Sequence, residues 1–146
     1  MAARQSAGTC ISFSATAPAT QTAAGYAALT WTVNADVINY GDIGGSYNVV
    51  ENTPICSGVK EKQLGSFDPG TLDITASYDP SNAAHTILKA AFAGKTKVSV
   101  KIVYATADIE YFQAFVTAMP KTVGGADDIL QIKTSLLLTT TIVPSP

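Results

Sequence analysis

The chain has 146 residues, of which 47% are hydrophobic and only 14% are charged, and its formal net charge is -2 at pH 7. A chain of this length buries about two-thirds of its unfolded surface, so it needs neither a disulfide nor a metal to fold as one domain. The small net charge and the single arginine, Arg4, argue against a dedicated nucleic-acid binder, because phosphate contacts require clustered lysine and arginine. The apolar excess instead predicts that part of the surface is buried against partners.

The N-terminal part of the chain predicts an arm, a short strand and a loop. Residues 1–8 have no periodic pattern and predict an arm that orders against a partner. Ile11 and Phe13 alternate with polar neighbours, which predicts a strand over residues 9–14, and residues 15–24 predict a loop. The N-terminus lacks the apolar core of a signal peptide, and no apolar run approaches the roughly 20 residues that span a bilayer. We therefore expect a cytoplasmic protein without a membrane segment.

A long strand and a long irregular segment follow. Residues 29–38 alternate between apolar and polar side chains, which predicts a strand with Trp31 near its start. Residues 40–70 hold six of the eleven glycines and have a weak hydrophobic pattern. Loops longer than about 12–15 residues are uncommon in compact domains unless they are functional. We interpret the part from about 41–64 as a loop that orders against a partner, with a small β insertion over residues 47–53 as an alternative.

The middle of the chain changes hydrophobic period twice and predicts strand, helix and strand. Residues 72–78 alternate as in a half-buried strand. Asp79 and Pro80 then favour a helix start, because aspartate accepts free amide hydrogens and proline suits the first helical position. Gly94 predicts the helix end, and residues 97–104 alternate again.

The predicted helix, about residues 80–93, has one apolar face. Side chains at the spacings i, i+3, i+4, i+7 and i+8 predict a core face made of Ala84, Ile87, Leu88, Ala91 and Phe92. Asn82, His85 and Lys89 fall on the other side and are expected in solvent. Burial of the larger apolar side chains would contribute roughly 1.5–3 kcal/mol each, so we expect the helix to cover one face or open end of a sheet.

The C-terminal third is again β-patterned. Residues 109–119 are apolar on both faces and must be covered twice, by the core and by the helix or another subunit. Residues 129–143 predict the last long strand. About six or seven strands and one helix predict a mainly β, single-domain protein over residues 1–146. The expected architecture is an antiparallel β-sandwich or partly closed barrel with one flanking α-helix.

Catalytic chemistry is not predicted, because the titratable side chains do not form a constellation. His85 is the single histidine, and the adjacent Asp127 and Asp128 would point to opposite faces of a strand, so we assign them to a turn. We do not interpret Cys10, Cys56 and the one histidine as a zinc site, which requires four ligands or three plus water. We interpret the cysteines as buried small hydrophobes or inert thiols. We expect no cofactor, no metal and no enzymatic activity.

Several segments occur in a characteristic order: an N-terminal GTCI, a tryptophan-bearing strand, GDIGGSYNVVENTP, LGSFDPGTLDITASYDP, NAAHTILKAAF and KTKVSVKI. In this order they resemble the major tail tube proteins of long-tailed bacteriophages. The resemblance covers most of the chain and is most specific over residues 65–94. It implies a β-sandwich flanked by a helix, assembled as hexameric rings that stack into a tube through which the genome passes. Related folds include the type VI secretion tube protein.

The resemblance implies that the long loop contacts neighbouring rings and that the terminal arms add further contacts. On this chain the loop maps to residues 41–64, and its candidate interface residues are Asp42, Ile43, Tyr47, Val49, Val50, Pro54, Ile55 and Val59. Deleting residues 43–62 is expected to leave a folded monomer that does not stack. The implied partners are further copies of the chain and the tape-measure, tail-tip and tail-terminator proteins. The implied location is the virion tail, after assembly in the host cytoplasm.

A tube of this kind has a lumen, and its wall would let viral DNA slide without specific binding if it is smooth and weakly negative. Asp36, Asp68 and Asp73 are candidates for lumen-facing acids, because they stand on or beside strands opposite predicted core residues. Ordinary solvent-facing acids are the equal alternative for each. Three lysines between residues 95 and 101 do not fit a uniformly acidic lumen unless their strand faces outward.

Other interpretations stay open. A secreted adhesin or carbohydrate-binding β-sandwich would stack sugars on Trp31, Tyr40 and Tyr47 and join Cys10 to Cys56 in a disulfide, although the missing signal peptide argues against it. A tail terminator or a type VI-like contractile injection tube subunit would share the fold and differ in how far it polymerises. An enzyme ranks last.

Overall fold

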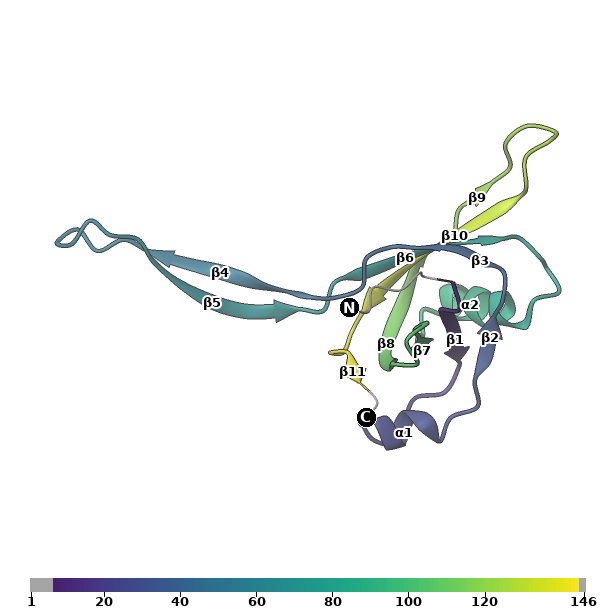
Figure 1. The fold of residues 1–146 in the computed structure, drawn as a ribbon, viewed down its shortest axis with the longest axis horizontal. Coiled ribbons are helices and arrows are strands. Elements are labelled where there is room, and N and C mark those ends of the chain that lie inside the picture. The colour runs from purple at the N-terminus through teal and green to yellow at the C-terminus, as the bar shows by residue number, and fades with distance from the viewer. Residues whose placement is uncertain (1–6, 145–146) are drawn as a thin grey trace.

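The computed structural model describes residues 7–144, and within them nine strands form one antiparallel sheet while two more form a separate hairpin (Figure 1). The sheet contains β1 (Cys10–Ser14), β2 (Thr32–Asn34), β3 (Val37–Tyr40), β6 (Thr71–Ser77), β7 (Lys97–Val103), β8 (Ile109–Ala118), β9 (Lys121–Thr122), β10 (Gln131–Leu138) and β11 (Val143–Pro144). The hairpin consists of β4 (Ser46–Asn52) and β5 (Glu61–Asp68). The helices are α1 (Ala23–Ala27) and α2 (Ala83–Gly94).

The sheet curves without closing. Its strands run in the order β2-β1-β7-β8-β10-β6-β3, with β11 paired to β8 and β9 paired to β10. The two end strands, β2 and β3, are separated in sequence by Ala35 and Asp36 alone, yet they do not pair with each other in the described chain. The predicted antiparallel, mainly β architecture with one main helix is confirmed, and the sheet is open rather than a closed barrel.

The core lies between one face of this sheet and α2, which contacts β1, β2, β7 and β8. Alternation along each strand sends every second side chain to this face. The buried cluster comprises Ile11, Phe13, Leu72, Ile74, Ala84, Leu88, Ala91, Val98, Val100, Ile102, Phe112, Ala114, Val116, Leu136 and Leu138.

The helix begins later than the sequence pattern predicts. Asn82 is the N-cap, and its side chain accepts a hydrogen bond from the Ala84 amide at 2.9 Å. Asp79 instead accepts from the amide and hydroxyl of Ser81, at 2.9 and 2.7 Å, and so forms a turn before the helix. Gly94 is the last helical residue, and Lys95 adopts the left-handed conformation that ends the helix, with φ 55°.

Two side chains of α2 lie where the pattern did not predict them. His85 was expected in solvent but is 1% exposed, because the turn around Asp79 folds back over it and the Asp79 carbonyl lies 3.2 Å from His85 Nδ1. Phe92 was expected in the core but is 47% exposed, so that prediction is wrong. Ala84, Leu88 and Ala91 are buried, and Ile87 packs at the edge of the core.

The sequence suggested that α2 or another subunit covers the second face of β8, but in the structure residues of α1 and Trp31 of the same chain lie on this face. Tyr26 of α1 is fully buried, and its ring stacks on Tyr111 of β8 with centroids 5.3 Å apart. Trp31 packs on the same ring at 5.9 Å and donates from Nε1 to the Tyr26 carbonyl at 3.1 Å. A second, smaller aromatic cluster therefore closes this side of the sheet.

Two predicted strands are interrupted. The strand expected over residues 29–38 divides into β2 and β3, because Asn34 Oδ1 accepts from the Asp36 amide at 3.2 Å and turns the chain. The strand expected over residues 129–143 ends at Leu138, and β11 follows as a separate short strand.

Candidate functional site

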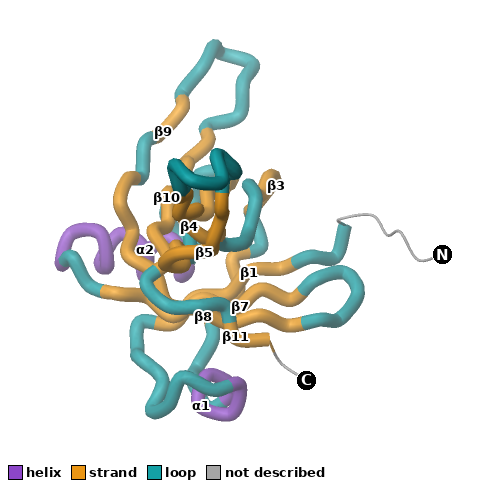
Figure 2. Tube along the Cα trace, turned by 90° about the vertical axis from the view of Figure 1, so that its left-hand side faces the viewer, coloured by secondary structure: helices purple, strands orange, loops and turns teal. Residues whose placement is uncertain are grey.

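The hairpin of β4 and β5 projects far from the sheet (Figure 1) and points toward the viewer in Figure 2. Every residue of its two strands is exposed except Gly65, which is half-buried. The segment predicted as a loop over residues 41–64 is therefore a β-hairpin that continues to Asp68. The alternative of a β insertion near residues 47–53 describes its first strand correctly.

The hairpin has one apolar face. Side chains that oppose each other across two strands lie on the same face. Tyr47 opposes Phe67, with ring centroids 4.9 Å apart, and Val49 opposes Leu64. These four residues, which we call the apolar face, are all exposed.

The other side of the hairpin is polar. Its opposed pairs include Ser46 with Asp68 and Asn52 with Glu61, and the Asn48 amide donates to the Ser66 hydroxyl at 3.0 Å. Val50, opposite Gln63, is the aliphatic exception on this side. The hairpin is thus amphipathic but has no core of its own chain beneath its apolar face. An uncovered apolar surface of this kind is typical of a protein contact site.

Glycines allow the close approach of the two strands at the root of the hairpin and a bulge in its middle. A Cβ at Gly45 would lie 2.3 Å from the Phe67 ring and 2.5 Å from the Asp68 carbonyl oxygen, so glycine is required for the two strands to meet there. The pairing register shifts between Tyr47 and Val49, which leaves Gly65 as an extra residue on β5.

This shift explains why sequence reasoning missed Leu64 and Phe67. The two residues are three apart rather than two, so they break the alternation that would have marked a strand, yet the bulge returns both to the same face. The combination of Gly65 with apolar residues on either side was the available signal.

The tip of the hairpin is a turn closed by the Gly58 amide, which donates to the Pro54 carbonyl at 2.8 Å. Ile55 is 100% exposed there, beside Cys56. Lys60 and Glu51 approach within 3.7 Å, but an exposed pair of this kind contributes only about 0–1 kcal/mol.

The predicted interface residues lie in different parts of the structure. Tyr47 and Val49 belong to the apolar face, Val50 lies on the opposite side, and Pro54, Ile55 and Val59 lie at or near the tip. Asp42 is exposed before the hairpin, and Ile43 packs against the body core instead of standing free.

A second projection is the β9–β10 connection, which extends from the other side of the body (Figure 1). Val123 and Ile129 are exposed on it, and sequence reasoning did not assign them to a surface. Asp128 accepts from the Gly125 amide at 2.7 Å and closes this turn. Asp127 and Asp128 are thus part of a turn in the structure.

The three acids proposed for a lumen do not share one environment. Asp36 accepts from the Asn82 amide group at 2.7 Å and so faces the start of α2. Asp68 accepts from the Gly70 amide at 2.9 Å and closes the turn between β5 and β6. Asp73 is exposed on the outward side of β6, opposite the buried Leu72 and Ile74 positions.

The described residues give no support for a sugar or metal site. Trp31, Tyr40 and Tyr47 engage Tyr111, the Thr9 carbonyl and Phe67 respectively, so they form no common stacking surface. Within residues 7–144 no group of three His, Cys, Asp or Glu side chains is arranged to hold a metal. No described helix has the length and apolar character needed to span a bilayer.

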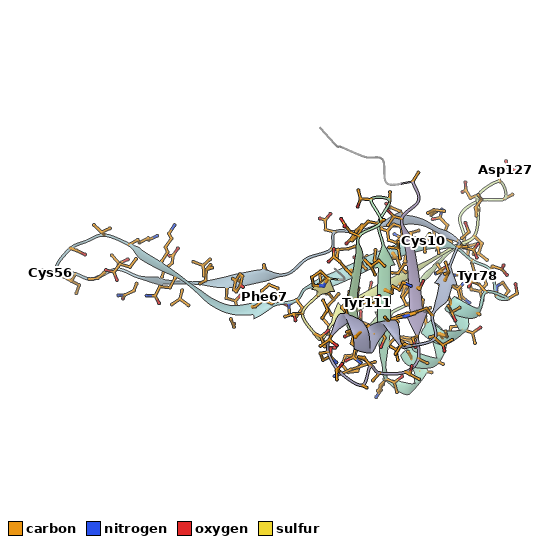
Figure 3. The ribbon with its side chains drawn as sticks, turned by 60° about the horizontal axis from the view of Figure 1, so that its bottom comes forward. Cys10, Cys56, Phe67, Tyr78, Tyr111 and Asp127 are labelled. Carbon is orange, nitrogen blue, oxygen red and sulfur yellow. The ribbon has the colours of Figure 1, made fainter. Side chains whose placement is uncertain are left out.

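The cysteines are free and exposed, so the interpretation as buried small hydrophobes is wrong, and the alternative of inert thiols stays a prediction. Cys56 lies at the hairpin tip and Cys10 lies in the body (Figure 3), so the alternative disulfide is also absent. The hairpin carries Cys56 away from β1 because it has no contacts that fold it back onto the sheet.

Two shallow hollows of about 340 Å³ each flank Tyr40. Their lining residues include one carboxylate, Asp42, and the phenols of Tyr40 and Tyr104. Burial raises the pKa of both tyrosines, which favours their neutral form.

No protein-family model matches the chain, and no curated protein matches its sequence. Solved structures nevertheless match its fold. The SPP1 tail tube structure aligns with TM-score 0.65 and 12% identity, covering 94% of this chain and 76% of that chain. The tail of an empty GTA particle, determined with C6 symmetry, gives TM-score 0.70 and 9% identity, with 99% and 100% covered.

A third similar structure is the sheath/tube terminator of the PVC extracellular contractile injection system, with TM-score 0.67 and 9% identity, covering 100% of this chain and 99% of that chain. The chain therefore has the fold of these tail and injection-system subunits. The predicted resemblance is confirmed at the level of the fold.

Proposed function

We propose that this chain is the structural subunit of a phage-type tail tube, built from stacked homo-oligomeric rings. The observation that carries the proposal is the hairpin of β4 and β5, whose apolar face is exposed on a body with the tail-tube fold. Burying apolar surface is the main driving force of association, so the hairpin supplies the energy for contact with a neighbouring ring.

The proposed role is mechanical rather than catalytic. Rings with sixfold symmetry would join into a conduit for viral DNA, located in the virion tail after assembly in the host cytoplasm. Tape-measure, tail-tip and terminator proteins are the expected partners besides further copies of the chain. Asp73 is the strongest of the three lumen candidates, because Asp36 and Asp68 already serve the fold of the subunit.

The test is electron microscopy of the purified protein at increasing concentration, beside its sedimentation profile. Val49→Asp and Val50→Asp are a matched pair, because the two side chains are adjacent and 58% and 54% exposed but lie on opposite faces of the hairpin. We expect rings or hollow tubes from the wild type, their loss in Val49→Asp and their retention in Val50→Asp. Equal effects of the two substitutions would reject the apolar face as the contact.

A tube terminator is the second candidate, favoured by the full-length match to the PVC sheath/tube terminator. A terminator would form discrete rings that do not elongate as concentration rises. Micrographs of the wild type distinguish the two, since a tube subunit forms stacks whose length increases with protein concentration.

A further inference from the structure

Four side chains meet at one corner of the body, where α2 and β9 approach the end of β6. The Tyr78 ring stacks over the buried His85 ring, with centroids 6.3 Å apart. Lys89 donates from Nζ to Tyr78 Oη at 2.9 Å, and Lys121 brings a second ammonium 4.5 Å from the centroid of the same ring. We call these four residues the Tyr78 corner.

The two ammonium groups of the Tyr78 corner have no acidic partner within residues 7–144, where the one ion pair is Lys60 with Glu51. The hydrogen bond from Lys89 and, second, the neighbouring Lys121 ammonium lower the pKa of Tyr78, which reflects a positive local potential. Two like charges held on one ring repel each other, and each ammonium retains N–H donors that an anion can accept. The corner is therefore suited to a carboxylate from outside the subunit.

Most acids of the described chain already serve its own fold. Carboxylates with a polar contact within the subunit are Asp36, Glu51, Asp68, Asp79, Asp108, Glu110 and Asp128. Those without such a contact in residues 7–144 are Asp42, Glu61, Asp73 and Asp127. Of these four, Glu61 alone belongs to the hairpin strands, where it forms the outermost pair with Asn52.

The hairpin tip and the Tyr78 corner lie at opposite ends of the molecule, as the positions of Cys56 and Tyr78 show in Figure 3. Glu61 therefore cannot reach the Tyr78 corner of its own subunit. A second copy, arranged head to tail, can bring the two together. Contacts between two different surfaces of one protein propagate from copy to copy instead of ending at a dimer.

We propose that the Tyr78 corner binds the Glu61 carboxylate of a neighbouring copy, with Lys89 and Lys121 as the two donors. The contact presupposes the proposed tube assembly and names the surface that receives the polar side of the hairpin, where Glu61 pairs with Asn52. A charge-assisted hydrogen bond between ammonium and carboxylate fixes the register of the hairpin on its neighbour, while the apolar face on the other side of the hairpin supplies buried area in a separate contact.

The experiment is a charge exchange followed by sedimentation and electron microscopy. Lys121→Glu alone and Glu61→Lys alone should each raise the concentration needed for assembly about tenfold or more, because each places like charges in contact. The double variant restores the opposite charges and should return to within about twofold of the wild type. Lys133→Glu is the matched control, because it makes the same charge change close to Lys121. Lys121 opposes Ile132 across β9 and β10, and Lys133, the next residue, lies on the other face of β10.

Carbodiimide crosslinking of assembled wild-type protein provides an independent readout. In a mixture of isotopically heavy and light chains, we expect Glu61 of one chain to be joined to Lys89 or Lys121 of another. Single variants that fail without rescue in the double variant would overturn the contact and leave the tube function standing. A wild type that never assembles would reject both, and Lys121-dependent binding of short DNA with unchanged assembly would assign the corner to phosphate instead.

Discussion

Leu88 and Phe92 lie one turn apart on α2 but in different surroundings, because Leu88 is fully buried and Phe92 is 47% exposed. Leu88→Ala should lower the free energy of unfolding by about 2–5 kcal/mol, since it removes buried methyl groups and leaves a cavity. Phe92→Ala should cost less than about 1 kcal/mol. Urea unfolding of both variants measures the difference, and a similar loss in each would mean that Phe92 is part of the core after all.

Tyr40 is expected to make the free energy of unfolding depend on pH in the alkaline range. Burial first, and the nearby Cys10 second, raise the pKa of Tyr40 from 10.0 to about 12. Because the folded state holds this proton more tightly than the unfolded state, its contribution to stability is complete below about pH 10 and is lost as the pH rises toward 12.

Tyr40→Phe should therefore make the decline of unfolding free energy above pH 10 less steep than in the wild type. Denaturant titrations at several alkaline pH values give the two slopes. Tyr78→Phe is the contrasting variant, because the hydrogen bond from Lys89 and the nearby Lys121 lower the pKa of Tyr78, so its removal should not flatten the decline. Identical slopes for wild type and Tyr40→Phe would contradict the assignment.

At the scale of elements, periodicity predicted those strands and helices that have one buried and one exposed face. β6 and β7 alternate in sequence and α2 carries its apolar stripe, so their existence followed from the sequence, whereas β8 was predicted from a run that is apolar on both faces. Boundaries were less certain because competing side chains decide them. Asp79 and Asn82 are both good helix caps, and the pattern of residues does not tell which of them captures an amide of the helix.

The hairpin was predicted only in part, as an alternative β insertion near its first strand, for a different reason. Its strands face solvent on both sides in the isolated subunit, so the usual alternation of buried and exposed positions is weak. The bulge at Gly65 also places Leu64 and Phe67 three residues apart. Sequence reasoning found the segment by its length and glycine content, and assigned it to a partner contact, but did not find which side chains form its apolar face.

Excising the hairpin tests whether it belongs to the fold or to assembly. Replacing residues 46–68 by a short Gly-Ser turn should leave a folded monomer, because the removed strands contribute nothing to the buried core. Ser46 and Asp68 oppose each other, so a short turn can join the flanking ends without strain. We expect the cooperative thermal transition to remain while assembly is lost, and an unfolded product would show that the body depends on the hairpin.

At the scale of the whole molecule, the chain combines a sheet body that buries its own core with a hairpin that does not. The hairpin extends away from the body (Figures 1 and 3), and the residues of its apolar face are exposed in the subunit. A contact between the hairpin of one copy and the body of the next is heterologous, and such contacts form rings or open stacks rather than dimers.

A heterologous contact makes the hairpin-deleted subunit a terminator of growth. The deleted subunit lacks the projecting hairpin but keeps the body surface that receives one, so it can join a growing end and offer no hairpin to the next ring. Small amounts mixed with the wild type should therefore shorten tubes in proportion to their mole fraction, as measured from length distributions in micrographs. If hairpins instead paired with hairpins, the deleted subunit could not join at all, and tube length would depend on the wild-type concentration alone.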